Sequence, residues 1–424
     1  MFQFLYQITI GLFAVAIQVL ALFSNKIKQG TAGRKGLLEE LEKSFQQRVN
    51  GRPVAWFHAA SLGEFEQGRP VIESFRSNYP GHFILLTFFS PSGYEIRKNY
   101  SGADYICYLP IDTLSNACRF VGVVNPQIVF FIKYEFWFNY LNLLRKRDCY
   151  VLSFSAIFHP QQIYFKSYGG FFRKMLRCFD HIFVQNKESL DLLESAGIQN
   201  GSIAGDTRFD RVKMIAANAA EPPGLNFFVC QKPCLVAGSV WEADMQVLIP
   251  VLNHFRGTLR AIIAPHEIRA DQIESWRKNL YGTSILYSEL KTRQSIEVCD
   301  YLIIDNIGML SALYKYGNMA FIGGSFGSGL HNILEAATFG LPVAFGDRKY
   351  HKFQEATDLI RKGGAFAVAN TEEITALFDK WIKEPEARIE AGKINEAYIS
   401  TGTGSTETIM NAVREVLKQA DQIL

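Results

Sequence analysis

Short apolar runs alternate with longer amphipathic stretches along the chain from residue 54 onward. Each run is bounded by Gly, Pro or Ser, and stretches such as 189–196 and 243–255 have the apolar spacing of helices. This alternation predicts βαβ units and parallel sheets. The expected strands are 54–58, 83–88, 105–108, 128–132, 149–153 and 181–184, followed by a second series at 234–237, 260–264, 301–304, 319–322 and 342–345.

The two series of strands are separated by a segment rich in small residues. It runs from Ala216 to Gly224 and contains a double proline, which cannot continue a helix. We therefore predict two doubly wound domains, 25–215 and 229–424, joined by a linker at 216–228. Ligands of open parallel sheets bind beyond the C-terminal ends of strands, so two such sheets would face a common cleft. By fold analogy, the last helical stretch, about 405–421, is expected to cross back onto the first domain.

The first 24 residues are expected to anchor the chain to a membrane. Residues 4–23 are mostly apolar and uncharged, which is just long enough to span a bilayer core. The basic residues that follow predict that the remainder is cytoplasmic; they are Lys26, Lys28, Arg34 and Lys35. A cleaved signal peptide would need positive charge before the apolar run, which is absent. Because Gln7 and Gln18 weaken the span, a core or interfacial helix remains the alternative.

Composition and charge narrow the classes of function. The 424 residues are 48% hydrophobic with a net charge of +3, which excludes disorder and gives no general field for nucleic acid. The seven cysteines form no CxxC pair, which argues against a zinc site. Unpaired thiols favour a reducing compartment and hence a cytoplasmic globular part.

The loop after the first expected strand carries the sequence Ser61-Leu-Gly-Glu64. Taken alone, Ser-x-x-Glu favours a capping box, with Ser61 at the N-cap and Glu64 three residues into the helix. The alternative is that Gly63 clears space for a ligand and that the Glu64 carboxylate takes a proton from an attacking hydroxyl.

Two further charged positions follow strands of the first domain. Glu135 comes shortly after the run 128–132, where it could stabilise a reacting sugar or simply pair with Lys133. Arg208 lies in Gly205-Asp-Thr-Arg208, where it could neutralise a phosphate leaving group or form ion pairs within a surface loop.

Three loops of the second domain have features of a nucleotide site. Gly238 and Ser239 follow one expected strand, and Pro265-His266 with Arg269 follows the next. The strongest signal is 321–337, where a strand leads into a loop with four glycines and a helix is expected to begin near His331 and end at Gly340. Such a loop exposes backbone N–H groups to an anion. It has neither the Walker spacing nor the dinucleotide fingerprint, and a purely structural glycine loop remains possible.

Together these motifs resemble the 3-deoxy-D-manno-octulosonic acid (Kdo) transferases of Gram-negative bacteria, in the family's order and over nearly the whole chain. The resemblance implies a GT-B fold and inverting transfer of Kdo from CMP-Kdo to a lipid A precursor, lipid IVA, at the inner membrane. It implies no metal, no other cofactor and no nucleic-acid partner. Glu64 would be the base, and Glu135 and Arg208 would stabilise the transition state. The candidate CMP-Kdo contacts are Gly238, Ser239, Pro265, His266, Arg269, Ile307, Gly308, Met309, Gly323, Gly324, Ser325, Asn332, Ile333, Leu334 and Glu335.

The chain departs from the family pattern at three places. Met309 stands where Glu is common, Arg208 where Lys is common, and Val240-Trp241 where a Thr-His-like pair is more usual. Two alternatives stay open: another GT-B enzyme that uses a UDP-sugar, and a non-catalytic module that binds nucleotide or lipid.

Overall fold

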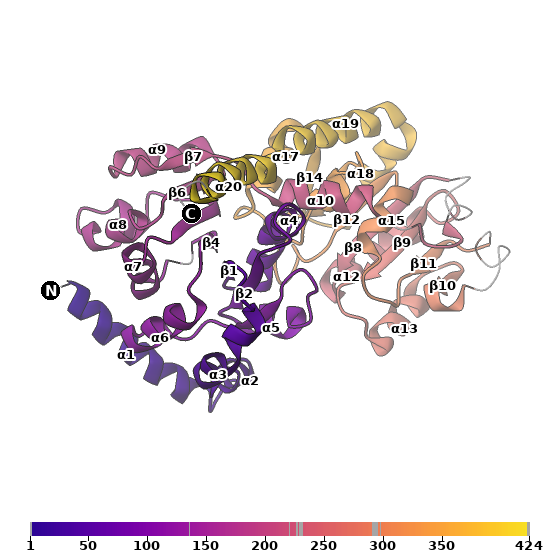
Figure 1. Ribbon diagram of the computed structural model, residues 1–424. Helices are drawn as coiled ribbons and strands as arrows, with labels where there is room; N and C mark the ends of the chain where they lie inside the picture. The colour runs from indigo at the N-terminus through magenta and orange to yellow at the C-terminus, as the bar shows by residue number, and fades with distance from the viewer. Residues whose placement is uncertain are drawn as a thin grey trace. The chain divides into compact units, whose positions relative to one another are not determined.

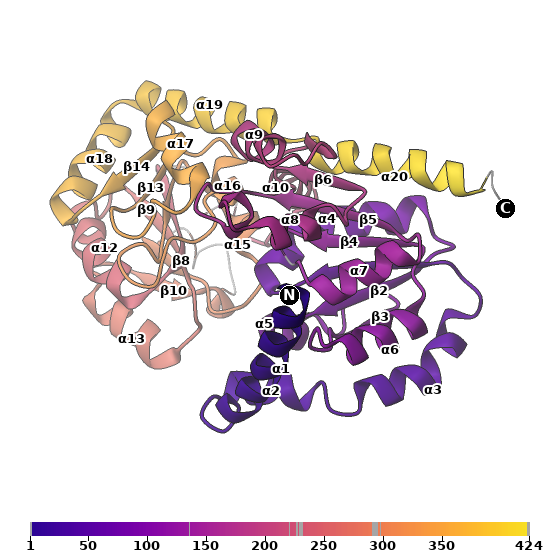
Figure 2. The same cartoon turned by 90° about the vertical axis from the view of Figure 1, so that its left-hand side faces the viewer.

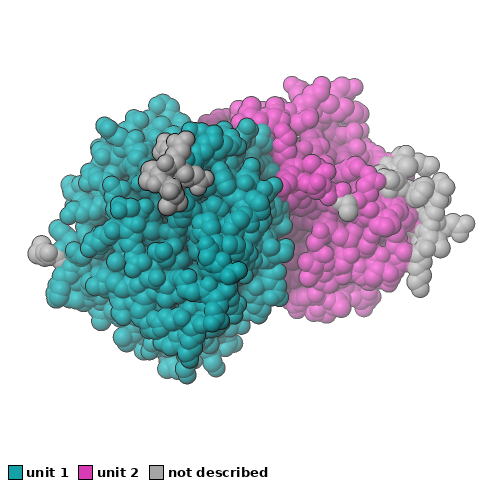
Figure 3. Space-filling view, viewed as in Figure 1, with its two compact units in different colours: residues 1–211, 403–424 teal, residues 212–402 magenta. Residues whose placement is uncertain are grey.

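A computed structural model describes residues 2–421 except 135, 220, 226–227, 229–231, 291–295 and 297. The chain divides into two compact units, residues 1–211 with 403–424 and residues 212–402, which are coloured separately in Figure 3. Each unit contains one seven-stranded sheet, and the pairings between its strands are parallel. This is the fold class that the alternation of apolar runs predicts.

The N-terminal unit has the strand order β3-β2-β1-β4-β5-β6-β7, with helices flanking the sheet (Figure 1). Its strands are β1 (Val54–Ala59), β2 (Phe83–Phe88), β3 (Tyr105–Tyr108), β4 (Ile128–Ile132), β5 (Tyr150–Ala156), β6 (His181–Val184) and β7 (Gly201–Ile203). Its helices are α1 (Phe2–Leu20), α2 (Asn25–Ala32), α3 (Leu37–Val49), α4 (Leu62–Asn78), α5 (Pro91–Arg97), α6 (Leu114–Val124), α7 (Phe138–Lys146), η1 (Ile163–Phe165), α8 (Gly170–Leu176), α9 (Lys187–Ser195), α10 (Arg208–Ala217), which runs past the unit boundary, and α20 (Ser405–Asp421).

The C-terminal unit has the strand order β10-β11-β9-β8-β12-β13-β14. Helices α12, α13 and α18 lie along one side of this sheet (Figure 2). Its strands are β8 (Cys234–Val240), β9 (Arg260–Pro265), β10 (Ser284–Leu286), β11 (Tyr301–Ile303), β12 (Met319–Ile322), β13 (Val343–Gly346) and β14 (Ala365–Val368). Its helices are α12 (Glu242–His254), α13 (Ala270–Asn279), η2 (Tyr287–Glu289), α15 (Leu310–Leu313), η3 (Tyr314–Tyr316), α16 (Leu334–Ala337), α17 (Gln354–Lys362), α18 (Thr371–Lys383) and α19 (Pro385–Gly402).

All the strands expected from the sequence are present, and three short strands were missed. These are β7, β10 and β14, each of three or four residues and each lying at the edge of its sheet. Their residues are largely half-buried rather than fully buried. Strands β7 and β10 have only three residues and begin with Gly or Ser, so hydrophobic pattern does not reveal them. The four residues of β14 are all apolar, and this run was passed over.

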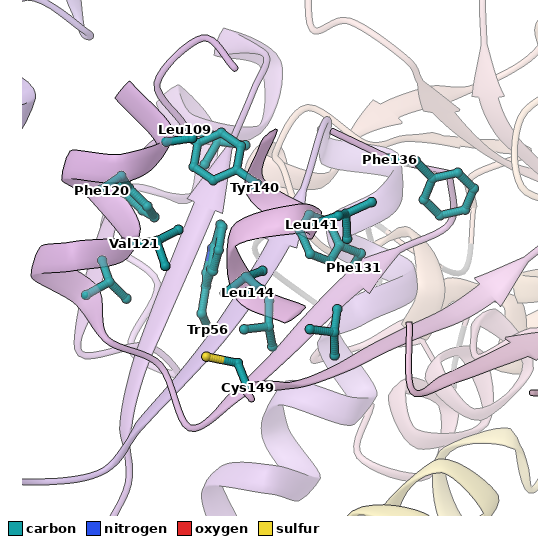
Figure 4. Close-up of a cluster of buried hydrophobic side chains, with 14 of the residues drawn as sticks. Trp56, Leu109, Phe120, Val121, Phe131, Phe136, Tyr140, Leu141, Leu144 and Cys149 are labelled. Carbon is teal, nitrogen blue, oxygen red and sulfur yellow. The ribbon is translucent and has the colours of Figure 1, made fainter. Parts of the chain in front are cut away.

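Two apolar layers hold the first sheet. One layer packs α3, α6 and α7 onto the sheet around Trp56, whose ring contacts Phe120, Phe131 and Tyr140 (Figure 4). The other layer lies on the opposite face and includes residues of α4 and α20. Because successive side chains of a strand point to opposite faces, strands with every residue buried are expected where helices cover both faces of a parallel sheet.

The structure divides the chain between Arg211 and Val212, slightly before the linker expected at 216–228, part of which lies outside the described residues. Residues 403–424 group with the N-terminal unit rather than with a C-terminal domain of 229–424. Helix α20 packs on α4, and the Asp210 carboxylate accepts the Gly404 and Thr406 N–H groups at its start, both at 2.7 Å. The expected return of 405–421 is therefore observed.

Helix α1 is, in the described part of the chain, the one helix long and apolar enough to cross a membrane. One face of it is attached to the N-terminal unit: Tyr6 Oη donates to Asp112 Oδ2 at 2.6 Å, and the Gln7 and Asn139 side-chain amides pair at 2.5 Å. The other face is apolar and exposed, with Phe4 68% and Leu12 66% exposed. Gln7, one of the two glutamines that weaken the predicted span, is therefore a contact between α1 and the rest of the N-terminal unit.

Candidate functional site

Glu64 lies in the first turn of α4, directly after β1, where the positive end of the helix stabilises a carboxylate. Ser61 is the N-cap, as predicted, but its side chain makes no cap hydrogen bond. Glu64 Oε2 instead accepts the N–H of Ala60 at 2.5 Å. Glu64 therefore reaches back to the residue before the N-cap, one position further than the expected capping box, and it is 9% exposed at the C-terminal end of the sheet.

Arg208 is joined to the helix of Glu64 through two buried groups. The Asp206 carboxylate accepts the Arg208 guanidinium at 2.8 Å and the Gln67 amide at 3.1 Å. Gln67 lies three residues after Glu64, so it shares that face of α4. Burial by itself raises the pKa of the Asp206 carboxyl. The Arg208 charge and the hydrogen bonds lower this pKa by more than burial raises it, so the net shift is downward. A charge-assisted chain from α4 to the start of α10 results.

Glu135 lies outside the described residues, so its place in the site stays a prediction. The residue two positions before it, Lys133, has a positive φ of 71° and its N–H donates to Phe154 O at 2.9 Å. A non-glycine residue in this region is strained and held there by its surroundings. The chain therefore turns sharply at the end of β4, immediately before the predicted position.

In the C-terminal unit, the loop after β8 lies against the glycine-rich loop. Ser239 has a φ of 53° at a bulge in β8, and Gly323 N–H donates to Gly238 O at 2.9 Å. A Cβ on Gly323 would lie 2.4 Å from Ser239 O, and one on Gly324 would lie 2.2 Å from Gly329 O. Glycine is required at 323 and 324 because the backbone itself occupies the space of a side chain.

Asp244 fastens these two loops together. It is fully buried at the start of α12, and its Oδ2 accepts the N–H of Trp241 and of Gly324, both at 2.8 Å. Burial raises the pKa of this carboxyl, an effect that the backbone hydrogen bonds oppose. One buried oxygen thus links the N-cap of α12 to the glycine-rich loop.

The side chain of Ser325 has a partner within the C-terminal unit. It is fully buried, and its hydroxyl donates to the carbonyl of Arg348. This contact holds the glycine-rich loop to the segment after β13, and the role of Ser325 in binding the donor stays a prediction.

The helix after this loop begins later than expected. It is α16, Leu334–Ala337, rather than a helix from His331, because Asn332 Oδ1 accepts the Leu334 N–H at 3.1 Å. Ile333 and Leu334 are buried in the unit. Asn332 and Glu335 lie side by side, with Asn332 Nδ2 donating to Glu335 Oε1 at 3.2 Å.

Glu335 also ties two candidate segments to each other. Its Oε2 accepts the Ser311 hydroxyl at 2.5 Å, and Ser311 lies just after the segment 307–309. Ile307 is 92% exposed, so this turn lies on the surface of the unit, and its Gly308 has a positive φ of 92°. The exposed turn 307–309 is therefore joined to Glu335 through Ser311.

The loop after β9 places its candidate residues at the same end of the sheet. Pro265 is half-buried, while His266 is exposed and stacks on the rings of Trp241 and His331. Arg269 is exposed and pairs with Asp271 at 3.2 Å, so its guanidinium faces solvent at the start of α13. His266 thus joins the glycine-rich loop, whereas no described contact connects Arg269 to it.

Asp244 and Gln67 were missed from the sequence. Asp244 had a local signal, since an acid three residues into a helix is a capping position after Trp241. Gln67 had only its spacing of three residues from Glu64. Among the described residues, no group of three His, Cys, Asp or Glu side chains is placed to hold a metal.

Comparison with known proteins shows which family the chain resembles. Residues 33–211 match the family model described as 3-deoxy-D-manno-octulosonic-acid transferase. A Kdo transferase of Aquifex aeolicus is 26% identical over 357 residues, covering 80% of this chain and 90% of the relative. One from Chlamydophila psittaci is 26% identical over 377 residues, covering 82% and 80%. The chain is a relative of the Kdo transferases. It is thus a glycosyltransferase.

Solved structures show the same fold at low identity. A UDP-GlcNAc 2-epimerase from Neisseria meningitidis aligns with a TM-score of 0.60 at 15% identity, covering 85% of this chain and all of that one. A glycosyltransferase from Rickettsia africae aligns with a TM-score of 0.55 at 11% identity, covering 87% and 99%. These likenesses establish the GT-B architecture of this Kdo transferase relative.

Proposed function

We propose that the chain transfers Kdo from CMP-Kdo to a lipid A precursor, lipid IVA, with inversion at the anomeric carbon. The observation that carries the proposal is Glu64: a carboxylate at the N-terminus of α4, beyond the C-terminal end of β1, in a relative of Kdo transferases. In open parallel sheets this is where substrates bind.

Glu64 is the proposed general base. Its Oε2 is fixed by the Ala60 N–H at 2.5 Å, which orients the carboxylate as a base requires. Taking the proton of the acceptor hydroxyl as the oxygen attacks the anomeric carbon of Kdo makes that oxygen a better nucleophile. The bond from Kdo to the CMP phosphate breaks as the new glycosidic bond forms.

Arg208 is proposed to stabilise the negative charge that develops on the departing CMP phosphate. The guanidinium is held by Asp206 at 2.8 Å, so it is oriented before the donor arrives. Preorganised charge of this kind lowers the barrier because it costs no reorganisation during the reaction. Glu135 is proposed to act beside it on the Kdo unit.

The donor is proposed to bind on the C-terminal unit. The segments 307–309 and 332–335, joined through Glu335 and Ser311, would hold the nucleoside, and the N–H groups of the loop at 323–324 would face its phosphate. Met309 stands where the family commonly has Glu, and this change leaves the backbone of the turn available to contact the nucleobase of the donor. The chemistry is assigned to these side chains without a cofactor.

Helix α1 is proposed to attach the enzyme to the cytoplasmic face of the inner membrane. Its docked face contacts Asp112 and Asn139, and its outer face carries exposed apolar residues. Exposed Lys26 and Lys28 follow it and would meet anionic headgroups. A lipid-linked acceptor would then reach Glu64 from the bilayer surface.

Mass spectrometry of lipid IVA after incubation with the purified full chain tests the proposal. A CMP-Kdo source in the reaction should add the mass of one or more Kdo units. A parallel panel of UDP-sugars should add nothing. Transfer from a UDP-sugar with none from CMP-Kdo would replace the proposed donor, and no product from any sugar would favour a binding module.

A further inference from the structure

Three aromatic rings from three loops of the C-terminal unit form a single cluster. Trp241 follows β8, His266 follows β9, and His331 ends the loop after β12. Trp241 Nε1 donates to His331 Nε2 at 2.9 Å, and the two rings are within 15° of parallel with centroids 6.3 Å apart. The ring of His266 stacks on both, with centroid distances of 4.4 Å to Trp241 and 4.2 Å to His331.

The Trp241 contact fixes where the proton of His331 lies. An indole N–H is only a donor, so His331 Nε2 must accept and carries no proton. The imidazole is then neutral and protonated at Nδ1. Burial and, to a smaller extent, the neighbouring His266 together lower the pKa of His331 to about 4. The partial desolvation of the His266 ring in the stack likewise lowers its pKa, although Glu267 opposes this shift.

Two further charged side chains lie near the cluster or the glycine-rich loop. Asp244 on α12 is engaged by the Trp241 and Gly324 N–H groups. Lys352, after β13, has its Nζ 3.8 Å from the position of a Cβ on Gly329. Neutral rings stack here without repulsion, whereas two protonated imidazoles 4.2 Å apart would repel each other.

Trp241 is itself fixed in place. It is the N-cap of α12, and its N–H is held by the same Asp244 oxygen that holds Gly324. A Cβ on Gly324 would lie 2.8 Å from His331 Cδ2, so His331 lies directly over the glycine-rich loop. The pair is therefore rigidly attached to the loop proposed to face the donor phosphate.

We propose that Trp241 is a positioning residue of the donor site. Its indole N–H holds His331 as a neutral imidazole protonated at Nδ1. The Trp241–His331 pair then supports the ring of His266, on which the nucleotide of the donor rests. This inference rests on the proposed function for the identity of the donor. The arrangement of protons does not depend on it.

The test uses the full chain with labelled histidine, with CMP as the probe. In the wild type, nitrogen chemical shifts should show His331 protonated at Nδ1 and titrating near pH 4. Trp241→Phe keeps a ring but removes the N–H, so the pKa of His331 should rise toward its ordinary value. The dissociation constant of CMP at pH 8 should rise about 2- to 10-fold, the range for one lost hydrogen bond.

Trp276→Phe is the matched control, because its indole also donates a hydrogen bond, to Glu242 Oε2 at 2.8 Å. It should change neither the His331 titration nor the affinity for CMP. Equal effects of both substitutions, or His331 protonated at Nε2 in the wild type, would overturn the positioning role and leave Kdo transfer untouched. A wild type that transfers sugar only from UDP-sugars and does not bind CMP would overturn the donor part together with the proposed function.

Discussion

The two units share a strand order but fasten their site loops by different means. The orders β3-β2-β1-β4-β5-β6 and β11-β9-β8-β12-β13-β14 are equivalent, and the seventh strand lies at opposite edges, beside β6 in one unit and beside β11 in the other. In the N-terminal unit the site loops are joined by side chains, from Gln67 through Asp206 to Arg208. In the C-terminal unit a buried carboxylate, Asp244, holds the backbone of the glycine-rich loop.

This difference reflects what each unit is proposed to do. A catalytic group must present a side chain at a defined place, so its neighbours are side chains that orient it. A nucleotide site uses backbone N–H groups, so the protein must fix the path of the loop itself. Substitutions in the first unit should therefore alter the rate of transfer, and those in the second should alter donor affinity.

The largest expected effect is from Glu64→Gln, which tests the first half of the comparison. The amide keeps an oxygen for the Ala60 N–H but cannot take a proton, so turnover should fall roughly a hundredfold or more. CMP affinity, measured by calorimetry, should stay within twofold. Glu73→Gln on the same helix removes a carboxylate that pairs with Arg69, and it should leave turnover near normal. Near-normal turnover of Glu64→Gln would remove Glu64 from the role of base.

Arg208→Met should come next in size. It keeps a long side chain but loses the charge proposed to stabilise the phosphate, so turnover should fall roughly 10- to 100-fold. Arg208→Lys should retain more activity than the Met variant, because charge is kept while the planar fork that grips Asp206 is lost. Arg211→Met removes a neighbouring charge as a control. A Lys variant no better than Met would mean that Arg208 acts through its hold on Asp206 rather than by charge.

The sequence predicted the architecture well because buried strands are encoded locally. Continuous apolar runs such as 83–88 and 128–132 have no other plausible place in a parallel α/β fold. Edge strands such as β7 have no such run of apolar residues. The grouping of α20 with the first unit is not encoded locally either, because it depends on Asp210 and on other contacts remote in sequence.

The candidate site was less readable from sequence, because its supports come from distant segments. The pairing of Gln67 with Asp206 joins residues 139 positions apart, and that of Asp244 with Gly324 joins residues 80 apart. Ser325 illustrates the same point: the sequence places it in the glycine-rich loop, but only the fold shows that its hydroxyl donates to the Arg348 carbonyl. Motifs identify the loops, whereas tertiary contacts decide which side chain in each loop faces outward.

Asp244→Ala tests the second half of the comparison. It leaves the Trp241 and Gly324 N–H groups without their acceptor, which should cost about 1–3 kcal/mol in the free energy of unfolding of the C-terminal unit. CMP affinity should fall about tenfold while turnover at saturating donor changes less. Asp244→Asn keeps an acceptor oxygen and should lie between. Full CMP affinity in the Ala variant would show that the loop keeps its shape without this carboxylate.

The N-terminal unit has a buried carboxylate of its own, and the smallest effect on turnover is expected there. Asp112, after β3, accepts the Asn139 and Tyr140 N–H groups at the start of α7, both at 3.0 Å, as well as the Tyr6 hydroxyl of α1. Burial raises the pKa of Asp112 to about 7, although these hydrogen bonds oppose the shift. It therefore fastens two helices rather than a ligand loop, and should influence stability and not the reaction.

The raised pKa of Asp112 determines how the stability of the N-terminal unit changes with pH. Between about pH 4 and pH 7 the unfolded chain loses the Asp112 proton while the folded chain keeps it, so the stability contributed by Asp112 is present at low pH and is lost as pH rises to 7. The free energy of opening at the α7 amides, from hydrogen exchange, should fall by at most about 1.4 kcal/mol per pH unit across this range. Asp112→Asn should flatten that slope. Asp104→Asn should not, because Arg76 and other partners outweigh burial and lower the pKa of Asp104, so that it titrates below this window. A slope that persists in Asp112→Asn would assign it to another group and leave Asp112 a purely structural acceptor like Asp244.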